Sequence, residues 1–203
     1  MIRLFKRTCR GVKLKQYVFC LESMNRELII EALQRAKLRR VERKRNIRNA
    51  LIYHGGDILS HHNFKRSGEN VQHGTISVKQ HSTEVAKQSL KIARGLRLRV
   101  KERELIRGAL LHDYFLYDWH KKDHECADKL HGFEHPKIAL RNALRDFKLT
   151  RVEKDIIRKH MWPLTIMNMP KCKEAWIVSM ADKYVSTLET LRLRKGNLKR
   201  KKH

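Results

Sequence analysis

An adjacent histidine and aspartate, His112 and Asp113, end an apolar run that has the spacing of an α-helix. Leu105, Ala109 and Leu110 recur as residues of one helical face do, and the pair continues that face. An imidazole and a carboxylate are thus predicted where a core normally holds leucine. Burying an unsatisfied charge is costly, and divalent metals accept both groups as ligands. We therefore expect the rest of the chain to supply further ligands.

Helical periodicity and capping signals predict an all-α chain. Ser77-Val-Lys-Gln80 and Thr150-Arg-Val-Glu153 both have the form of a capping box, which opens a helix. We find no alternating β pattern of any length and no internal repeat. The predicted helices cover residues 25–54, 78–94, 100–116, 119–129, 136–147, 151–160 and 171–195, with a loop at 61–74.

Glycine and proline set the predicted helix ends. Gly95 and Gly196 follow the last periodic residues of two helices, where glycine readily takes the left-handed conformation that ends a helix. Pro136 suits the first position of a helix, where its missing N–H would be unpaired anyway, and this places His135 at the N-cap. The glycines of residues 54–57 predict a turn.

The net charge of +26 is concentrated at the two ends of the 203-residue chain. Residues 1–50 hold 15 Lys or Arg against four Asp or Glu, and residues 191–203 hold seven against none. We predict a basic, partly helical extension at 1–55, a helical metal-binding domain at 56–195 and a basic tail at 196–203. Such charge favours phosphates, nucleic acids or acidic membrane surfaces as partners.

Composition also bears on the compartment. The four cysteines form no CxxC pair, which predicts reduced thiols and a cytoplasmic protein. No apolar run approaches the roughly 18 residues that span a membrane. Residues 1–23 are basic and nearly free of acids, as targeting peptides are, but they are also poor in Ser. The alternative is that translation begins at Met24.

Four further helices each place one polar residue on an apolar face. A single such histidine is more often a hydrogen-bonded core residue, but several together favour a shared site. With the His-Asp pair, six groups are predicted to point inward, and their two carboxylates would be strongly unfavourable without a cation. Two divalent metals fit this count, with one bridging carboxylate and a separation of roughly 3.5–4 Å. The four added residues are His81, His135, His160 and Asp182.

The order His, His-Asp, His, His, Asp on helices resembles the HD-domain superfamily of metal-dependent phosphohydrolases. The matching pieces are His81-Ser-Thr-Glu-Val-Ala, Gly-Ala-Leu-Leu-His112-Asp113, His135-Pro-Lys-Ile-Ala, Ile-Arg-Lys-His160-Met and Ala-Asp182-Lys. The resemblance covers residues 73–190, and residues 112–163 look like an uncharacterised bacterial branch. It implies one metal held by His81, His112, Asp113 and Asp182, and a second held by His135 and His160 with Asp113 bridging. The Gly-Tyr-Pro signature of the cyclic-dinucleotide branch is missing, which argues against that substrate.

The resemblance implies a compact HD-type helical bundle that hydrolyses a phosphate ester with metal-activated water. We expect one or two divalent ions (Mn, Fe, Co, Ni, Mg or Zn) and, as substrate, a nucleotide or a related small phosphorylated metabolite. Three further residues are candidates for catalysis beside Asp113, although each also fits a plain surface position. They are Lys183 as a phosphate contact, His131 as an acid for the leaving group and Glu84 as a group that orients water.

A nucleic-acid-binding module with a vestigial or secondary metal site is the alternative function. The two basic ends motivate it, and it predicts binding that weakens steeply with salt. No recognisable nucleic-acid-binding motif is present. A purely structural helical protein is disfavoured, because it would bury two carboxylates without a cation.

Overall fold

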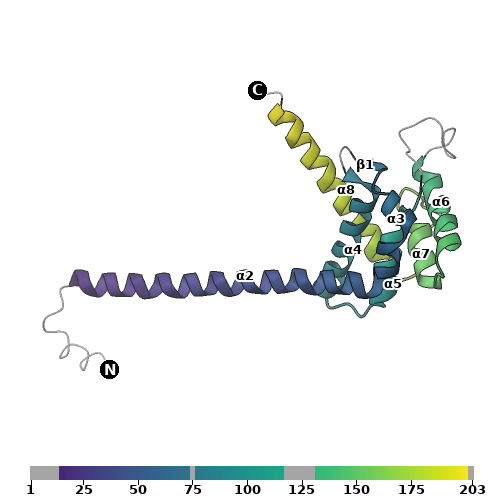
Figure 1. The fold of residues 1–203 in the computed structure, drawn as a ribbon. Helices are drawn as coiled ribbons and strands as arrows, with labels where there is room; N and C mark the ends of the chain where they lie inside the picture. Colours follow the sequence, from purple (N-terminus) through teal and green to yellow (C-terminus); the bar gives the residue numbers. More distant parts are fainter. Residues whose placement is uncertain (1–13, 74–75, 117–130, 201–203) are drawn as a thin grey trace. The chain divides into compact units, whose positions relative to one another are not determined.

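The computed structural model describes residues 14–73, 76–116 and 131–200, most of which are helical (Figure 1). The all-α prediction is confirmed. Within these residues lie seven helices: α2 (Leu14–Ser60), α3 (His62–Arg66), α4 (Val78–Gly95), α5 (Glu102–Leu111), α6 (His131–Asp146), α7 (Arg151–Lys159) and α8 (Lys173–Arg200).

A small antiparallel pair of strands precedes α4. β1 (Val71–His73) pairs with β2 (Ile76–Ser77), and Ser77 then becomes the N-cap of α4. This pair and the short helix α3 correct the predicted loop at 61–74. Strands of three and two residues are too short to give the alternating pattern from which a strand is predicted.

The chain divides into two compact units, residues 1–46 and 47–203. In the first unit, residues 26–46 of α2 are exposed without exception. In the second unit, Ile47 and Leu51 of the same helix are buried with the core residues of α4, α5, α7 and α8. The proposed boundaries at residues 55 and 195 stay predictions. Neither α2 nor any other helix in the described ranges has an apolar stretch that could cross a bilayer.

Both predicted capping boxes are present and fix the first residues of α4 and α7. Ser77 Oγ accepts the amide N–H of Gln80 at 3.3 Å, and Gln80 Oε1 accepts the amide of Ser77 at 3.0 Å. Thr150 Oγ1 accepts the amide of Glu153 at 3.3 Å, and Glu153 Oε2 accepts the amide of Thr150 at 2.6 Å. Two backbone donors are satisfied at each helix start, so these starts could be predicted to the residue.

The end of α4 differs from the prediction, because Arg97 takes the left-handed conformation expected of Gly95. Gly95 is the last helical residue, and Arg97 has φ 53°. The amide of Arg97 bonds to the carbonyl of Arg94 at 3.2 Å, and the amide of Leu98 bonds to that of Ala93 at 2.8 Å. These two bonds form a Schellman motif with Arg97 at C′.

Gly55 and Gly56 lie inside α2, so the predicted turn at 54–57 is wrong. A methyl group on Gly55 would come within 2.5 Å of Leu110 Cδ1 and 3.5 Å of Ile106 Cγ2. Glycine at this position therefore permits the close approach of α2 to α5. A methyl group on Gly56 would have no atom within 4 Å, so packing does not require glycine there and the helix tolerates it.

Two other predicted helix ends are also wrong. Pro136 is the sixth residue of α6, which begins at His131. A proline near a helix start removes one backbone hydrogen bond, and Pro136 is buried in the packed structure. Gly196 lies inside α8, since one glycine costs a helix only about 1 kcal/mol and does not end it. The predicted helix at 119–129 falls outside the described residues.

Candidate metal centre

The His-Asp pair lies just beyond the end of α5, not within a helix that continues to residue 116 as predicted. His112 is the C-cap and retains helical torsions, with φ −60° and ψ −35°. The pair therefore still points into the core, where His112 is 0% exposed and Asp113 is 3% exposed. Asn142 of α6 donates a hydrogen bond of 3.1 Å to the carbonyl of Tyr114, the residue that follows the pair, and so fixes the backbone there.

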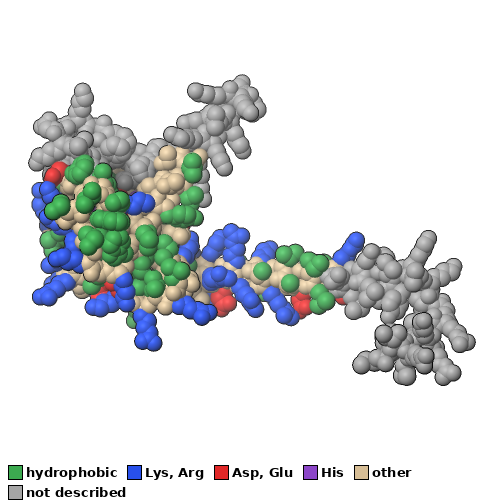
Figure 2. All heavy atoms as spheres, turned by 180° about the vertical axis from the view of Figure 1, so that it is seen from behind, with side chains coloured by type: hydrophobic (Ala, Val, Ile, Leu, Met, Phe, Trp, Pro, Cys, Tyr) green, Lys and Arg blue, Asp and Glu red, His purple; other side chains and the backbone are tan. Residues whose placement is uncertain are grey.

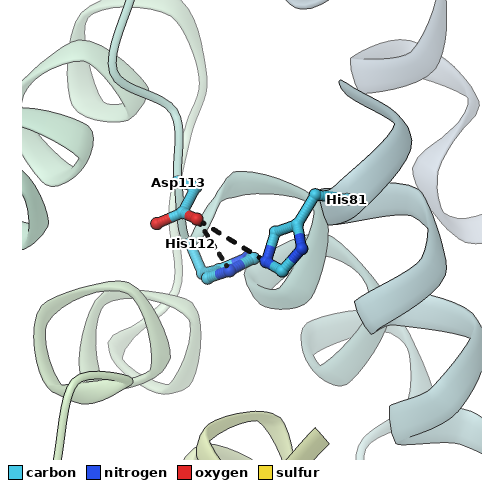
Figure 3. A group of neighbouring side chains, drawn as sticks. All are labelled: His81, His112 and Asp113. Carbon is cyan, nitrogen blue, oxygen red and sulfur yellow. Dashed lines mark ion pairs between the residues drawn. The ribbon is translucent and has the colours of Figure 1, made fainter. Parts of the chain in front are cut away.

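The first group of side chains joins α4, the end of α5 and α8. Asp113 Oδ2 lies 3.3 Å from His112 Nε2 and 3.7 Å from His81 Nε2 (Figure 3). Asp182 Oδ1 lies 3.1 Å from His81 Nε2 and 3.7 Å from His112 Nε2. All four residues are buried, so two carboxylates and two imidazoles share one small interior space.

The second group uses the other oxygen of Asp113. Asp113 Oδ1 lies 3.2 Å from His135 Nε2 and 3.4 Å from His160 Nε2, and the two Nε2 atoms are 2.8 Å apart. His135 is the fifth residue of α6, which corrects its predicted N-cap position, and His160 caps the end of α7. The ligand atoms of His81, His112 and Asp113 lie within 4.8 Å of one another, as do those of Asp113, His135 and His160, so each set is close enough to hold a metal ion.

Backbone carbonyls fix the tautomers of two of these histidines. His112 Nδ1 is 2.8 Å from the carbonyl of Ala109, and His160 Nδ1 is 2.9 Å from that of Ile157. Only an N–H can approach a carbonyl oxygen so closely, so each neutral ring carries its hydrogen on Nδ1 and a lone pair on Nε2. Within the described part of the chain, the buried His112 Nε2 makes no hydrogen bond. A lone pair aimed at carboxylate oxygens suits a cation between them, so these residues fit a divalent metal.

The pKa values of the residues in both groups describe the charge balance of the centre when no cation is bound. Burial raises the pKa of Asp113, but the imidazoles, His112 foremost, outweigh burial and hold that pKa well below its usual range. Burial lowers the pKa of His81 and His112, yet the carboxylates raise these values to about 9 and about 10. Burial lowers the pKa of His160 to about 4. Protons thus balance the carboxylates when no metal does, and a metal ion would compete with them.

Sequence reasoning missed Glu189, which lies against the first group. Its Oε2 is 3.0 Å from His81 Nδ1, and the residue is only 6% exposed. Glu189 follows Asp182 by seven residues on α8, so the two side chains lie on one helical face two turns apart. That spacing from the inward Asp182 was the sequence signal that could have identified Glu189.

The remaining candidates occupy different surroundings. Lys183 lies at the edge of the centre, where Nζ donates to the carbonyl of His160 at 2.5 Å and lies 3.4 Å from Asp182 Oδ2. Glu84 belongs to neither group; its half-exposed carboxylate pairs with Lys87 at 3.2 Å and Lys91 at 3.6 Å. The side chain of His131 lies outside the described residues.

Comparison with known proteins places this arrangement in a family. A family model described as HD domain matches residues 78–187, which is more than half of the 203 residues. The match spans both groups, from His81 to Asp182. No curated protein and no solved structure matches the chain. The chain therefore belongs to the HD-domain family, whose members are generally metal-dependent hydrolases.

Proposed function

We propose that the protein is a phosphohydrolase that uses two divalent metal ions to cleave a phosphate ester. One observation carries the proposal: Asp113 turns one carboxylate oxygen toward His81 and His112, and the other toward His135 and His160. A carboxylate shared between two groups of imidazoles is the arrangement expected of a bridging ligand in a two-metal site.

Under this proposal the two groups supply two sets of ligands that share Asp113. His81, His112, Asp113 and Asp182 would hold the first ion, and Asp113, His135 and His160 the second. When bound, such ions lower the pKa of a coordinated water toward neutrality and withdraw charge from phosphoryl oxygens. The surrounding protein contributes burial, which strengthens electrostatic interactions by excluding bulk water.

Lys183 would position the substrate from the edge of the centre. The ammonium group of Lys183 lies beside Asp182, and its side chain is 40% exposed, so it is within reach of a ligand that enters from solvent. It therefore suits a contact with a phosphoryl oxygen. We assign His131 as proton donor to the leaving group. Glu84 would orient water only after leaving its ion pairs with Lys87 and Lys91.

A hydrolysis screen with a matched pair of variants tests the activity. The protein is assayed with added Mn²⁺ or Mg²⁺ against nucleoside mono-, di- and triphosphates and generic phosphomono- and diesters. Asp113→Ala should abolish turnover, whereas Glu174→Gln should keep it, because the buried Glu174 binds the Lys101 amide at 3.0 Å and belongs to neither group. Turnover by Asp113→Ala equal to that of the wild type would refute the proposal.

A second candidate function follows from the exposed part of α2. Residues 35–45 hold seven Lys or Arg against one Glu, all of them exposed, and Figure 2 shows blue side chains projecting from both sides of this helix. At 100° per residue these cations surround the helix, whereas a membrane-surface helix needs a broad apolar face. A helix with charge on all sides suits the phosphates of a nucleic-acid groove, so we propose nucleic-acid binding here.

Binding to duplex DNA and to RNA is measured by fluorescence anisotropy across a salt series. Neutralising three α2 cations should weaken binding and lower the slope of log K against log salt by about 3, nearly one unit per lost phosphate contact. Neutralising three exposed cations of α7 should change neither quantity. Equal effects of the two triple variants, or no binding by the wild type, would contradict this function. The α2 variant carries Arg39→Gln, Arg43→Gln and Arg45→Gln, and the control carries Arg151→Gln, Lys154→Gln and Arg158→Gln.

A further inference from the structure

His81 is oriented differently from His112 and His160. In those two residues a backbone carbonyl of the preceding turn accepts the Nδ1 hydrogen. In His81 the corresponding atom faces the carboxylate of Glu189, with Nδ1 and Oε2 3.0 Å apart. A carboxylate is a stronger acceptor than a peptide carbonyl, and it belongs to a side chain that a substitution can remove.

Two carboxylates compete for the one hydrogen of a neutral His81 ring. Asp182 Oδ1 lies 3.1 Å from Nε2, on the side of the ring opposite Glu189. If the hydrogen lies on Nε2, the ring donates to Asp182 and its lone pair points away from the centre. If it lies on Nδ1, the ring donates to Glu189, and the Nε2 lone pair faces the centre as a metal ligand must. His81 is fully buried and Glu189 is 6% exposed, so water competes little for either hydrogen bond.

One face of α8 carries both the predicted ligand and the group that orients its neighbour. Asp182, Ser186 and Glu189 follow one another at intervals of four and three residues, the spacing of one helical face. Ser186 Oγ lies 3.3 Å from Asp182 Oδ1 and donates to it, while Glu189 reaches His81 on α4. A helix holds these side chains at a fixed separation, so the position of Asp182 and the orientation of His81 are coupled.

We propose that Glu189 is a positioning residue of the metal centre, which holds His81 as the Nδ1–H tautomer and aims its Nε2 at the metal. This inference rests on the metal site of the proposed function. Glu189 touches neither metal nor substrate; it acts through His81. Its loss frees the hydrogen to move to Nε2, where Asp182 accepts it and blocks the ligand atom.

Metal affinity in matched variants of α8 tests the role. Mn²⁺ and Zn²⁺ titrations by calorimetry, with a competing chelator for tight binding, compare Glu189→Ala and Glu189→Gln with Glu174→Gln. Removing a group that orients a ligating histidine typically lowers metal affinity about 10- to 100-fold, and we expect this of Glu189→Ala. Glu189→Gln should also weaken binding, because its amide can donate to Nδ1 and favour the wrong tautomer. Glu174→Gln replaces a glutamate on the same helix that is 3% exposed, and it should bind metal like the wild type.

Nuclear magnetic resonance of ¹⁵N-histidine-labelled, Zn²⁺-loaded protein adds a readout that a purely structural role would not move. The wild type should show a slowly exchanging, strongly hydrogen-bonded Nδ1–H for His81, and Glu189→Ala should lose it while the signals of His112 and His160 persist. Unchanged affinity and proton exchange in Glu189→Ala would overturn the inference and leave the metal site intact. An equal loss in Glu174→Gln would also overturn it, as a general effect of altering α8. A wild type that binds no metal would instead remove the proposed function.

Discussion

The buried ion pair between Arg107 and Glu153 is the contact whose loss should most disturb the centre from outside it. Arg107 Nε donates to Glu153 Oε1 at 2.7 Å, and the two residues are 3% and 0% exposed. Arg107 also donates to Asp57 of α2. The pair joins α5, which leads into His112 and Asp113, to α7, which leads into His160. Arg107→Met removes the charge and retains most of the side-chain volume.

The expected cost follows from what remains around Glu153. Removing one partner of a buried pair costs about 3–5 kcal/mol, because the other charge stays buried. Glu153 keeps its hydrogen bond of 2.6 Å from the amide of Thr150, and the half-exposed Arg103 lies 3.7 Å away. We therefore expect the lower end, about 3 kcal/mol, which lowers the melting temperature of a chain of this size by roughly 6–12 °C. Glu153→Gln keeps one oxygen for the Thr150 amide, but it leaves the buried Arg107 charged with only the half-exposed Asp57 as partner, so we expect a similar cost of about 3 kcal/mol.

Urea unfolding followed by circular dichroism gives the free energies of both single variants and the double variant. The double-mutant cycle should show a coupling energy of at least about 1 kcal/mol between the two residues. Metal affinity of Arg107→Met should fall as well, since its α5 and α7 ligands lose their connection. An Arg107→Met protein within about 1 kcal/mol of the wild type would show that this pair does not hold the two helices together.

Four other substitutions test single features of the fold. Gly108→Ala should destabilise the protein by about 2 kcal/mol, because its methyl would lie 2.9 Å from Ile156 Cβ. Gly56→Ala should instead stabilise the protein by up to about 1 kcal/mol, because its methyl would meet nothing within 4 Å. Urea midpoints that move in the same direction in both variants would contradict this contrast. Arg97→Gly should stabilise by about 0.5–1 kcal/mol, since glycine adopts φ 53° without steric cost, and a lower melting temperature would argue against strain there. Burial raises the pKa of Asp155, but its hydrogen bonds and the neighbouring Lys159 outweigh burial and lower that pKa. The stability that the ionised Asp155 contributes is therefore present above pH 3.8 and is lost as the pH falls further. Asp155→Asn should flatten that part of the profile of stability against pH, and an unchanged profile would exclude the contribution.

Local signals predicted the two capped helix starts and the inward orientation of the polar residues on apolar faces. Ser77 and Thr150 satisfy backbone donors through side chains only three residues apart, so these starts depend on nothing distant. His81 and Asp182 share helical faces with apolar neighbours, and burial of those faces brings the side chains inward. The order of the polar residues then indicated the family, which the match to residues 78–187 confirms.

The features that sequence reasoning got wrong depend on contacts between distant segments. Gly55 appeared to be a turn residue because its closeness to Leu110, 55 positions later, leaves no trace in the local sequence. Glu189 was missed because its partner, His81, lies on α4, 108 positions earlier in the chain. Arg97 at the left-handed position has no local signal, since glycine two residues earlier is the expected choice.

Metal stoichiometry tests the central claim most directly. Protein purified in the presence of Mn²⁺ and then freed of unbound ions is analysed by elemental mass spectrometry, together with Asp113→Ala and Glu174→Gln. Asp113 faces both groups, so the account predicts up to two ions per chain in the wild type and in Glu174→Gln, and none in Asp113→Ala. Wild-type protein without bound metal, or an Asp113→Ala protein that holds as much metal as the wild type, would contradict it.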